Sequence, residues 1–377
     1  MRARTPTPDY ALIGHQESWE QISHLVHGLR APDKPALGLQ TLRETVPWIP
    51  PRAIVHSRNF SLASDPVDGV YIETFLTPDE LAQGALRRGI QRVEEAIGVA
   101  VREGARIAAL GGFTSILLEG RAERMPHPPG MALTTGNTLT AAFIAKGVER
   151  AMAMLRVPLE DATLLVIGAT GDVGSACSRY FAPRVRRLLL AARRQDRLES
   201  LANALATAGS ETRWTTDIRA VIPEADVVIA VASLGQAAID LSTCRSDALV
   251  CDAGYPKNLH PPQVAGPLVF HGGMGCSLGG WTCDSPLLDR FYTFPAPFVG
   301  HGCLLEGMVL AMERRFEPFS QGRGNITPAR MEEIYAIAGR HGLVPAPFFD
   351  HRGLWPKQPP MALTGGRSPA SAELAAP

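Results

Sequence analysis

The chain has 377 residues, of which 45% are hydrophobic and 20% charged, so it is long enough for two or three domains with a sizeable core. Its 37 lysines and arginines balance 37 aspartates and glutamates, and the net charge therefore gives no reason to expect nucleic acid or an anionic membrane as a partner. It has neither a signal-peptide pattern nor a run of about 18 apolar residues, so we expect a cytoplasmic protein with no integral membrane segment.

The first half of the chain predicts an α/β substrate domain over residues 10–155, preceded by a flexible N-terminus at 1–9. An amphipathic helical pattern covers 79–103, and an apolar strand then leads into a glycine-rich segment. A further helix is expected to begin in the segment TTGNT (134–138), whose polar residues are typical of a helix cap.

The second half alternates apolar runs of strand length with helical patterns. The runs cover residues 164–169, 187–192, 226–233, 248–254 and 267–273. This alternation is typical of a parallel sheet covered by helices, so we predict an α/β fold class with a Rossmann-type domain. We place this domain at 156–298, a C-terminal helical layer at 299–351, and a disordered tail rich in Pro and Ala at 352–377.

The strand at 164–169 runs directly into a turn with glycines three residues apart, and a helix follows. Glycine lets the backbone turn sharply and approach a pyrophosphate, and a helix N-terminus offers unpaired N–H groups to the phosphates. In this context the turn predicts a dinucleotide site, although a plain tight turn is the alternative. The predicted cofactor contacts here are Gly168, Thr170, Gly171, Asp172, Val173 and Gly174.

The end of the second strand indicates which dinucleotide binds. NAD-selective sites usually carry an acidic residue there, but this chain has Arg193 and Arg194. Two cations suit a 2′-phosphate, so we predict NADPH; the alternative is that both arginines are solvated residues at a helix start. Further cofactor contacts are expected at the ends of two later strands, from Ala232, Ser233, Gly254 and Tyr255.

The six cysteines are too sparse for a disulfide framework, and neither they nor the histidines have metal-ligand spacing, so no metal is expected. Cys177 and Cys251 fall at natural core positions. Cys303 precedes a helical run, where the helix dipole would lower its pKa, whereas Glu306 three residues on would raise it. On spacing alone, a cysteine in an apolar helix is most often a packing residue.

Several short segments, in this order and spacing, resemble the aldehyde-forming long-chain fatty acyl-[acyl-carrier-protein] reductases of cyanobacterial type over nearly all of residues 11–346. The matching strings are LIGH (12–15), YIETFLTPDEL (71–81), ALGGFTSI (109–116), TTGNT (134–138), VIGATGDVGSA (166–176), AR (192–193), VAS (231–233), DAGYPKN (252–258) and NIT (325–327). The chain departs most from the family pattern at 274–298, a connection that holds Cys276 and Cys283 and bears on the shape of the acyl pocket.

The resemblance implies NADPH-dependent reduction of a fatty acyl thioester, carried by acyl-carrier protein or coenzyme A, to a fatty aldehyde. In the family a cysteine thiolate attacks the thioester and holds the acyl group, and NADPH then delivers a hydride. The family's pattern around this cysteine is matched by residues 302–308, which implies that Cys303 is the nucleophile. An aldehyde-consuming enzyme is a further partner that the resemblance implies.

Negative charge builds on the carbonyl oxygen in such a reduction, so fixed donors are expected around it. The candidates are the backbone N–H groups of 111–115, with Ser115, and those of 135–138, together with Lys257 as a proton donor and His301 as the base that activates the thiol. We expect the acyl chain between the N-terminal unit and the C-terminal helices. The basic stretches 184–187 and 313–315 are candidates for receiving acyl-carrier protein.

Two other functions remain open from the sequence. One is a shikimate-dehydrogenase-like NADP oxidoreductase that acts on a small carbonyl substrate without a covalent intermediate, in which case Cys303 only packs. The other is a non-catalytic NADPH-binding partner protein. The presence of the glycine turn, the arginines and Cys303 in one chain argues against the second.

Overall fold

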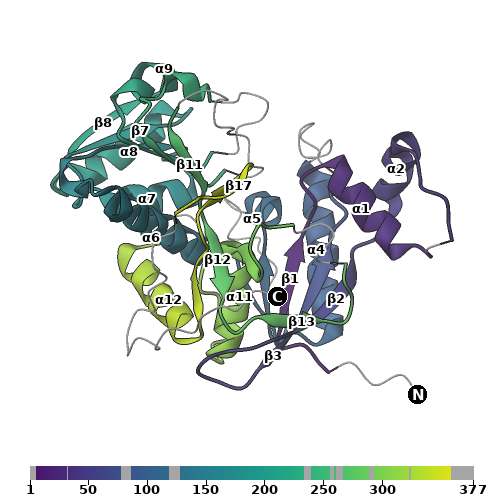
Figure 1. The fold of residues 1–377 in the computed structure, drawn as a ribbon. Helices are drawn as coiled ribbons and strands as arrows, with labels where there is room; N and C mark the ends of the chain where they lie inside the picture. The colour runs from purple at the N-terminus through teal and green to yellow at the C-terminus, as the bar shows by residue number, and fades with distance from the viewer. Residues whose placement is uncertain are drawn as a thin grey trace.

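The computed structural model describes residues 6–31, 33–77, 86–118, 128–232, 239–254, 259, 266–287, 293–321 and 324–357. Within them the chain forms two six-stranded sheets, with helices between and around them (Figure 1). The predicted α/β fold class with a parallel Rossmann-type sheet is confirmed. In the described part of the chain, no helix combines the length and apolar character needed to span a bilayer.

The N-terminal sheet has the strand order β13-β2-β3-β1-β4-β5, with β3, β1, β4 and β5 parallel and β2 antiparallel to both of its neighbours. Its strands are β1 (Tyr10–Gly14), β2 (Arg52–Asn59), β3 (Val67–Glu73), β4 (Ile107–Leu110), β5 (Ala132–Thr134) and β13 (Trp281–Cys283). The helices of this half are α1 (Trp19–Leu29), α2 (Leu39–Thr45), α4 (Leu86–Glu103) and α5 (Phe113–Leu118), with a short turn η1 (Val46–Trp48).

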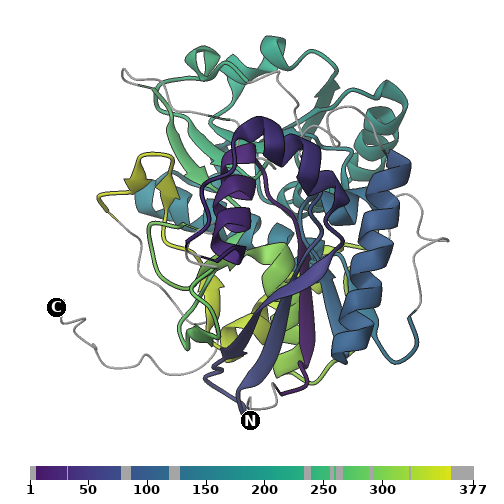
Figure 2. The same ribbon diagram turned by 90° about the vertical axis from the view of Figure 1, so that its right-hand side faces the viewer.

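Different helices cover the two faces of this sheet. Because successive strand residues point to opposite faces, Ala11 and Ile13 of β1 pack towards α4, while Tyr10 and Leu12 face the side of α11 (Gly302–Met312). The blue helix α4 lies alongside the strands in Figure 2. Its buried apolar stripe consists of Val93, Ala96, Ile97 and Ala100. The helix predicted at 79–103 is thus present from 86 on, and 79–85 lie outside the described residues.

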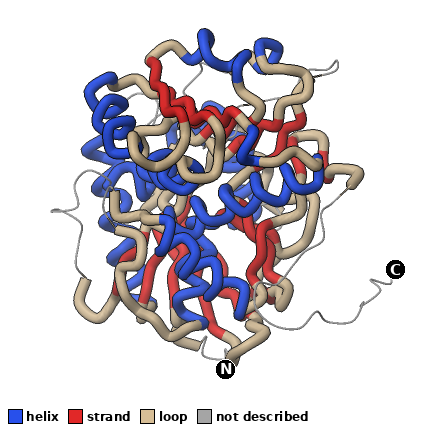
Figure 3. Tube along the Cα trace, turned by 90° about the vertical axis from the view of Figure 1, so that its left-hand side faces the viewer, coloured by secondary structure: helices blue, strands red, loops and turns tan. Residues whose placement is uncertain are grey.

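The Rossmann sheet has the order β11-β10-β9-β6-β7-β8, with all neighbours parallel. Its strands are β6 (Thr163–Ile167), β7 (Arg187–Ala191), β8 (Glu211–Thr215), β9 (Val227–Ala230), β10 (Leu249–Asp252) and β11 (Leu268–His271), and its helices are α7 (Asp172–Phe181), α8 (Gln195–Leu205) and α9 (Ile218–Val221). Helices lie in front of and beside the strands in Figure 3. Only β8 falls outside the predicted runs, because this partly exposed edge strand has no continuous apolar sequence.

Helix α6 (Asn137–Leu155) joins the two halves of the molecule. It is buried along most of its length and packs against α7, α11, α12 (Pro328–Arg340) and β10. A helix that is apolar on nearly all sides is stable only when every face meets another element, as here. This packing sets the position of the N-terminal sheet relative to the Rossmann sheet.

The connection at 274–298 leaves the Rossmann sheet. β12 (Met274–Ser277) pairs with β14 (Val299–His301) and β15 (Leu343–Pro345), and β13 forms the edge of the N-terminal sheet through its pairing with β2. The Rossmann domain was expected to end at residue 298, but the chain leaves the Rossmann sheet earlier, after β11. The reason is that the partners of β12 and β13 lie in distant parts of the sequence.

Both expected flexible ends are ordered in part. β16 (Phe349–Asp350) and β17 (Gly353–Leu354) form a hairpin, after which Trp355 is 9% exposed and donates from Nε1 to the Val269 carbonyl at 2.8 Å. The predicted disordered tail at 352–377 is thus corrected for 352–357, because the indole buries apolar area and satisfies its donor. At the N-terminus, the Asp9 carboxylate accepts from Arg314 at 2.8 Å.

Candidate active site

A cavity of about 530 Å³ lies at the carboxyl ends of the Rossmann strands, where ligands bind in sheets of this kind. Most of the predicted site residues meet there. Its lining includes Gly168, Thr170, Gly171, Asp172, Val173, Gly174, Arg193, Arg194, Ala232, Gly254, Ser115, His301 and Cys303. Three further predicted residues, Ser233, Tyr255 and Lys257, lie outside the described residues.

At two positions of the glycine turn, the backbone leaves no room for a side chain. Gly168 has φ +86°, and a Cβ there would lie 2.9 Å from the Ala232 nitrogen. A Cβ on Gly174 would lie 2.2 Å from the Gly168 oxygen. No side chain caps the first turn of α7, whose N–H groups can therefore receive a phosphate. The turn fits a dinucleotide.

Asp172, a predicted cofactor contact, has a second role. Its carboxylate accepts from Asn137 Nδ2 at 3.0 Å and from the Gly324 N–H at 3.4 Å. Asn137 is the first residue of α6, so this carboxylate links the glycine turn to the helix that joins the two sheets. Both side chains line the cavity.

The two predicted arginines differ in their surroundings. Arg194 directs its guanidinium to Asp196, with Nε–Oδ1 at 3.1 Å, and this pair raises the pKa of Arg194 and lowers that of Asp196. Arg193 makes no ion pair with any described residue, and neither does Arg197, which also lines the cavity. Arg197 was not predicted, although its position four residues after Arg193 was a signal for it. Arg193 and Arg197 are thus better placed for a 2′-phosphate than Arg194.

Cys303 lies in the first turn of α11 and is half-buried. Burial raises the pKa of its thiol, the backbone hydrogen bonds of Gly112, Leu304 and Cys303 itself lower it, and the Glu306 carboxylate raises it further. The lowering by the start of the helix and the raising by Glu306, both expected from the sequence, are therefore present. The net effect is that the pKa of Cys303 is raised. The same backbone groups supply fixed donors around the sulfur.

Close backbone contacts hold the start of α11 in place. Gly136 has φ +70°, and a Cβ there would lie only 2.0 Å from the Cys303 carbonyl oxygen. A Cβ on Gly302 would lie 2.9 Å from Thr140 Cα. Glycine at these two positions lets α11 approach the start of α6 without an intervening side chain.

Glu306 caps α6 from a different helix. Its buried carboxylate accepts from Thr134 Oγ1, from the Leu139 N–H at 2.9 Å and from Ser320 Oγ at 2.9 Å. Burial raises the pKa of Glu306, and these hydrogen bonds oppose the rise. The TTGNT segment was expected to cap its own helix, but the N-cap is Gly136, which makes no side-chain cap bond. A carboxylate at a helix N-terminus also suits the helix dipole.

A histidine that sequence analysis missed supports the donor loop beside Cys303. His15 Nδ1 donates to the Gln16 carbonyl at 3.0 Å, and Nε2 accepts from the Phe113 N–H at 3.0 Å. Burial lowers the pKa of His15 to about 4, so the ring is neutral at physiological pH. Ser115 Oγ donates to the Gly112 carbonyl at 2.9 Å, which further orders this loop. The signal was the LIGH string, because β1 and β4 are parallel neighbours and their carboxyl ends meet.

A second cavity, of about 850 Å³, begins beside the first. It lies between α11 and one face of the N-terminal sheet, and its apolar lining includes Leu12, Leu304, Leu305 and Met308. Residues 293–298, from the connection that departs from the family pattern, form another wall. His301 borders both cavities, and its ring packs against Phe294 at 5.7 Å.

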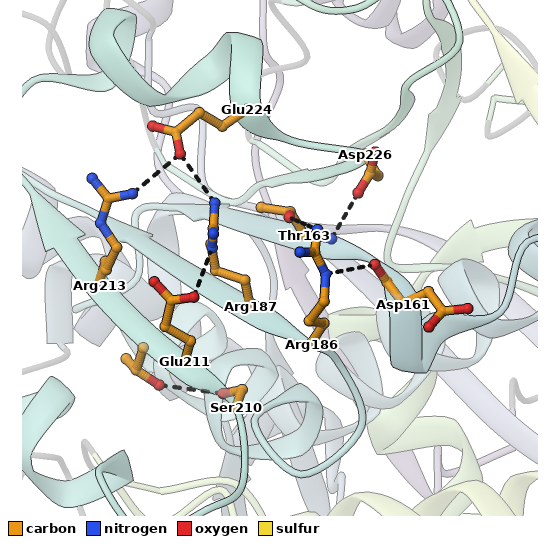
Figure 4. Close-up of polar contacts among 10 residues, drawn as sticks. Asp161, Thr163, Arg186, Arg187, Ser210, Glu211, Arg213, Glu224 and Asp226 are labelled. Carbon is orange, nitrogen blue, oxygen red and sulfur yellow. Dashed lines mark hydrogen bonds and ion pairs between the residues drawn. The ribbon is translucent and has the colours of Figure 1, made fainter.

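The basic stretches 184–187 and 313–315 are engaged in local contacts. Arg187 pairs with Glu211 at 3.1 Å and with Glu224 at 3.4 Å, next to a pair between Arg213 and Glu224 (Figure 4). These residues surround the amino-terminal starts of β6 and β7, whereas the cofactor cavity lies at the carboxyl ends. In the second stretch Arg314 pairs with Asp9, and Arg315 with Glu317 and Glu333. Arg184 and Arg186 instead donate to backbone carbonyls, of Tyr180 and Asp161, and Arg186 is exposed, so the first stretch keeps cations that no carboxylate pairs with in the described part of the chain.

Comparisons with known proteins match this chain over residues 150–265 or over most of its length. The family described as Shikimate / quinate 5-dehydrogenase matches residues 150–265, which hold the glycine turn. The long-chain acyl-[acyl-carrier-protein] reductase of Synechococcus elongatus is 33% identical over 348 residues, 89% of this chain and 98% of that protein. Aminotransferase PigE of a Serratia species is 28% identical over 294 residues, 74% of this chain but 32% of that protein. Quinate dehydrogenase from Corynebacterium glutamicum in complex with NAD aligns over 86% of this chain and 97% of its own at 15% identity, with a TM-score of 0.32, too low to support an argument.

Proposed function

Because the chain belongs to the long-chain acyl-[acyl-carrier-protein] reductase family, we propose that it reduces a fatty acyl thioester to an aldehyde with NADPH, through an acyl group held on Cys303. One observation carries the proposal: Cys303 and the glycine turn line the same cavity, and a largely apolar cavity begins beside them. The match to the family described as Shikimate / quinate 5-dehydrogenase ends at residue 265 and does not include Cys303. This match therefore does not favour a small-carbonyl substrate.

In the proposed first step the Cys303 thiolate attacks the thioester carbonyl carbon. The bond from this carbon to the carrier sulfur breaks, the carrier leaves as a thiol after taking up a proton, and a new thioester to Cys303 forms. Backbone N–H groups at Gly112 and at the first turn of α11 hydrogen-bond the reacting sulfur and so favour its thiolate form. NADPH, when bound, would supply the hydride for this thioester. The bond from the acyl carbon to the Cys303 sulfur then breaks, which releases the aldehyde and returns Cys303 as a thiolate.

His301 is the residue we assign to the proton transfers. Imidazole is the usual group for this task near neutral pH, and the His301 side chain borders both cavities beside the start of α11. The remaining parts of the chain hold the ligands: the glycine turn holds the pyrophosphate, Arg193 and Arg197 bind the 2′-phosphate, and the second cavity receives the acyl chain.

The proposal is tested by mass measurement of the intact protein after incubation with an acyl thioester in the absence of NADPH. A covalent reductase gains the mass of one acyl group, and addition of NADPH removes that mass as aldehyde appears. Cys303→Ser should gain none, whereas Cys244→Ser, at a partly exposed site away from both cavities, should behave as wild type. Turnover of a small ketone without any acylated protein would instead favour the shikimate-dehydrogenase-like alternative.

A further inference from the structure

The far end of the second cavity is polar. Cys303 lies level with Gly112, just past the end of β4, because the Gly112 backbone hydrogen-bonds its sulfur. Tyr10 pairs with Ile107 at the start of β4 and also lines the second cavity. At about 3.3 Å per strand residue, Tyr10 is roughly 15 Å from the nucleophile. The chain of a bound acyl group would therefore run past Leu304, Leu305 and Met308 before it reaches Tyr10.

Tyr10, Ser57 and Asn59 together form what we call the polar row. Tyr10 and Ser57 both pair with Gly69, and a Cβ on Gly69 would lie 2.3 Å from Tyr10 Cζ. The phenol ring can lie across the sheet only because this residue is glycine. The Tyr10 hydroxyl hydrogen-bonds the Ser57 side chain, and Ser57 Oγ accepts from Asn59 Nδ2 at 3.0 Å.

The polar row is an unfavourable end for a plain hydrocarbon chain. Each hydroxyl offers one donor and two lone pairs, and the bonds within the row use only part of this capacity. Tyr10 is 1% and Asn59 2% exposed, so Ser57 is the half-exposed member of the row, and a terminal methyl group placed against it would cover its hydroxyl without giving it a partner, which weakens binding. A hydroxyl or oxo group on the chain would supply that partner.

We propose that the preferred acyl group carries a hydroxyl or oxo function towards its far end, and that the polar row binds this function. The inference rests on the proposed acyl-thioester reduction and specifies its substrate class. The neighbouring strand β13, in the connection where the chain departs most from the family pattern, extends the same row: Cys283 pairs with Ser57 and lines the cavity.

The test compares pairs of coenzyme A thioesters of equal chain length, one unsubstituted and one with a hydroxyl on the terminal carbon. Unsubstituted thioesters from C4 to C18 first locate the lengths that the enzyme accepts. At a length that reaches the row, kcat/KM for the hydroxylated member should exceed that of its partner roughly two- to tenfold, the effect of one added hydrogen bond. A preference for the unsubstituted member at every accepted length would overturn the inference.

Substitutions test whether the polar row causes the preference for hydroxylated thioesters. Tyr10→Phe should abolish the preference. Tyr335→Phe, which removes the hydroxyl of a buried tyrosine on α12 outside the cavity, should keep it. If Tyr10→Phe does not fold, Ser57→Ala makes the same test, and a preference retained in the folded variant would overturn the inference. If no thioester is reduced and Cys303 gains no acyl mass, the proposed function is wrong as well. If thioesters are reduced without the preference, only the inference about the polar row is wrong.

Discussion

The two cavities are built in different ways. One wall of the cofactor cavity is the backbone of the glycine turn and helix start within residues 168–174, and a single Cβ would fill this turn. The walls of the second cavity are side chains from β1, β2, β3, β13 and α11, which come from distant parts of the chain. The first cavity therefore tolerates few substitutions, whereas the second can change its chemistry one side chain at a time while the cofactor site stays intact.

The largest effect is expected where the two cavities meet. Cys303→Ser removes the thiolate, so aldehyde formation should fall by roughly a thousandfold or more, as it does when an enzyme loses its nucleophile. NADPH binding, measured by fluorescence titration, should stay within about twofold of wild type because the glycine turn is a separate element. A loss of activity of only a few-fold would assign Cys303 a packing role.

The next prediction tests whether the close backbone contact between Gly136 and Cys303 holds the nucleophile in position. Gly136→Ala places a Cβ 2.0 Å from the Cys303 oxygen, and a displacement of about 1 Å at a reacting group costs roughly a hundredfold in rate. Gly130→Ala is the matched control, since Gly130 has φ +75° but nothing within 4 Å of its added Cβ. The control should lose about 1–2 kcal/mol in free energy of unfolding and no activity beyond that. Equal activities of the two variants would contradict the close-contact argument.

The arginines provide a test of the cofactor cavity by itself. Arg193→Gln and Arg197→Gln should each weaken NADPH by about one to two decades in Kd, the worth of a charge-assisted bond, and leave NADH nearly unchanged. Arg194→Gln should have a smaller effect because its guanidinium is already held by Asp196. An effect of Arg194→Gln as large as the other two would mean that the pair with Asp196 opens when the cofactor binds.

The pH dependence of acylation follows from the direction of the Cys303 pKa. Burial raises this pKa, so the thiol is mostly protonated at neutral pH and the thiolate fraction grows with pH. The rate of acylation in the absence of NADPH should rise about tenfold per pH unit and level off only above the usual thiol range near 8.5. Rapid-mixing mass measurements from pH 6 to 10 give the profile. A plateau already present below pH 7 would show that the backbone donors outweigh burial.

The smallest expected effect shows which ligand occupies which cavity. Cys283 is exposed and lines only the second cavity, whereas Cys244 lines neither. In the Cys303→Ser protein, a saturating acyl thioester should slow alkylation of Cys283 by iodoacetamide several-fold and leave Cys244 unchanged, because a bound ligand buries most of its pocket's surface. NADPH should protect neither thiol. Protection of Cys283 by NADPH instead would reverse the assignment of the cavities.

The parts of the site that consecutive residues encode could be predicted from the sequence. The glycine turn, the strands around it and the arginines after β7 follow from local periodicity and backbone requirements, and the resemblance pointed to Cys303. Arg197, His15 and the role of Glu306 as a cap for α6 were not predicted from the sequence. These roles depend on which loops meet at the carboxyl ends of neighbouring strands, a matter of tertiary packing.

The amino-acid sequence by itself determined the α/β class, the parallel sheet and its cofactor turn, because each depends on the period of apolar residues or on glycines at fixed offsets in one short segment. Only the tertiary structure decided that β13 joins the N-terminal sheet, that Trp355 belongs to the core, and that Tyr10, Ser57 and Asn59 share one end of a cavity. Pairing between distant strands is governed by which apolar faces remain uncovered once the rest of the chain has packed. No single segment carries that information.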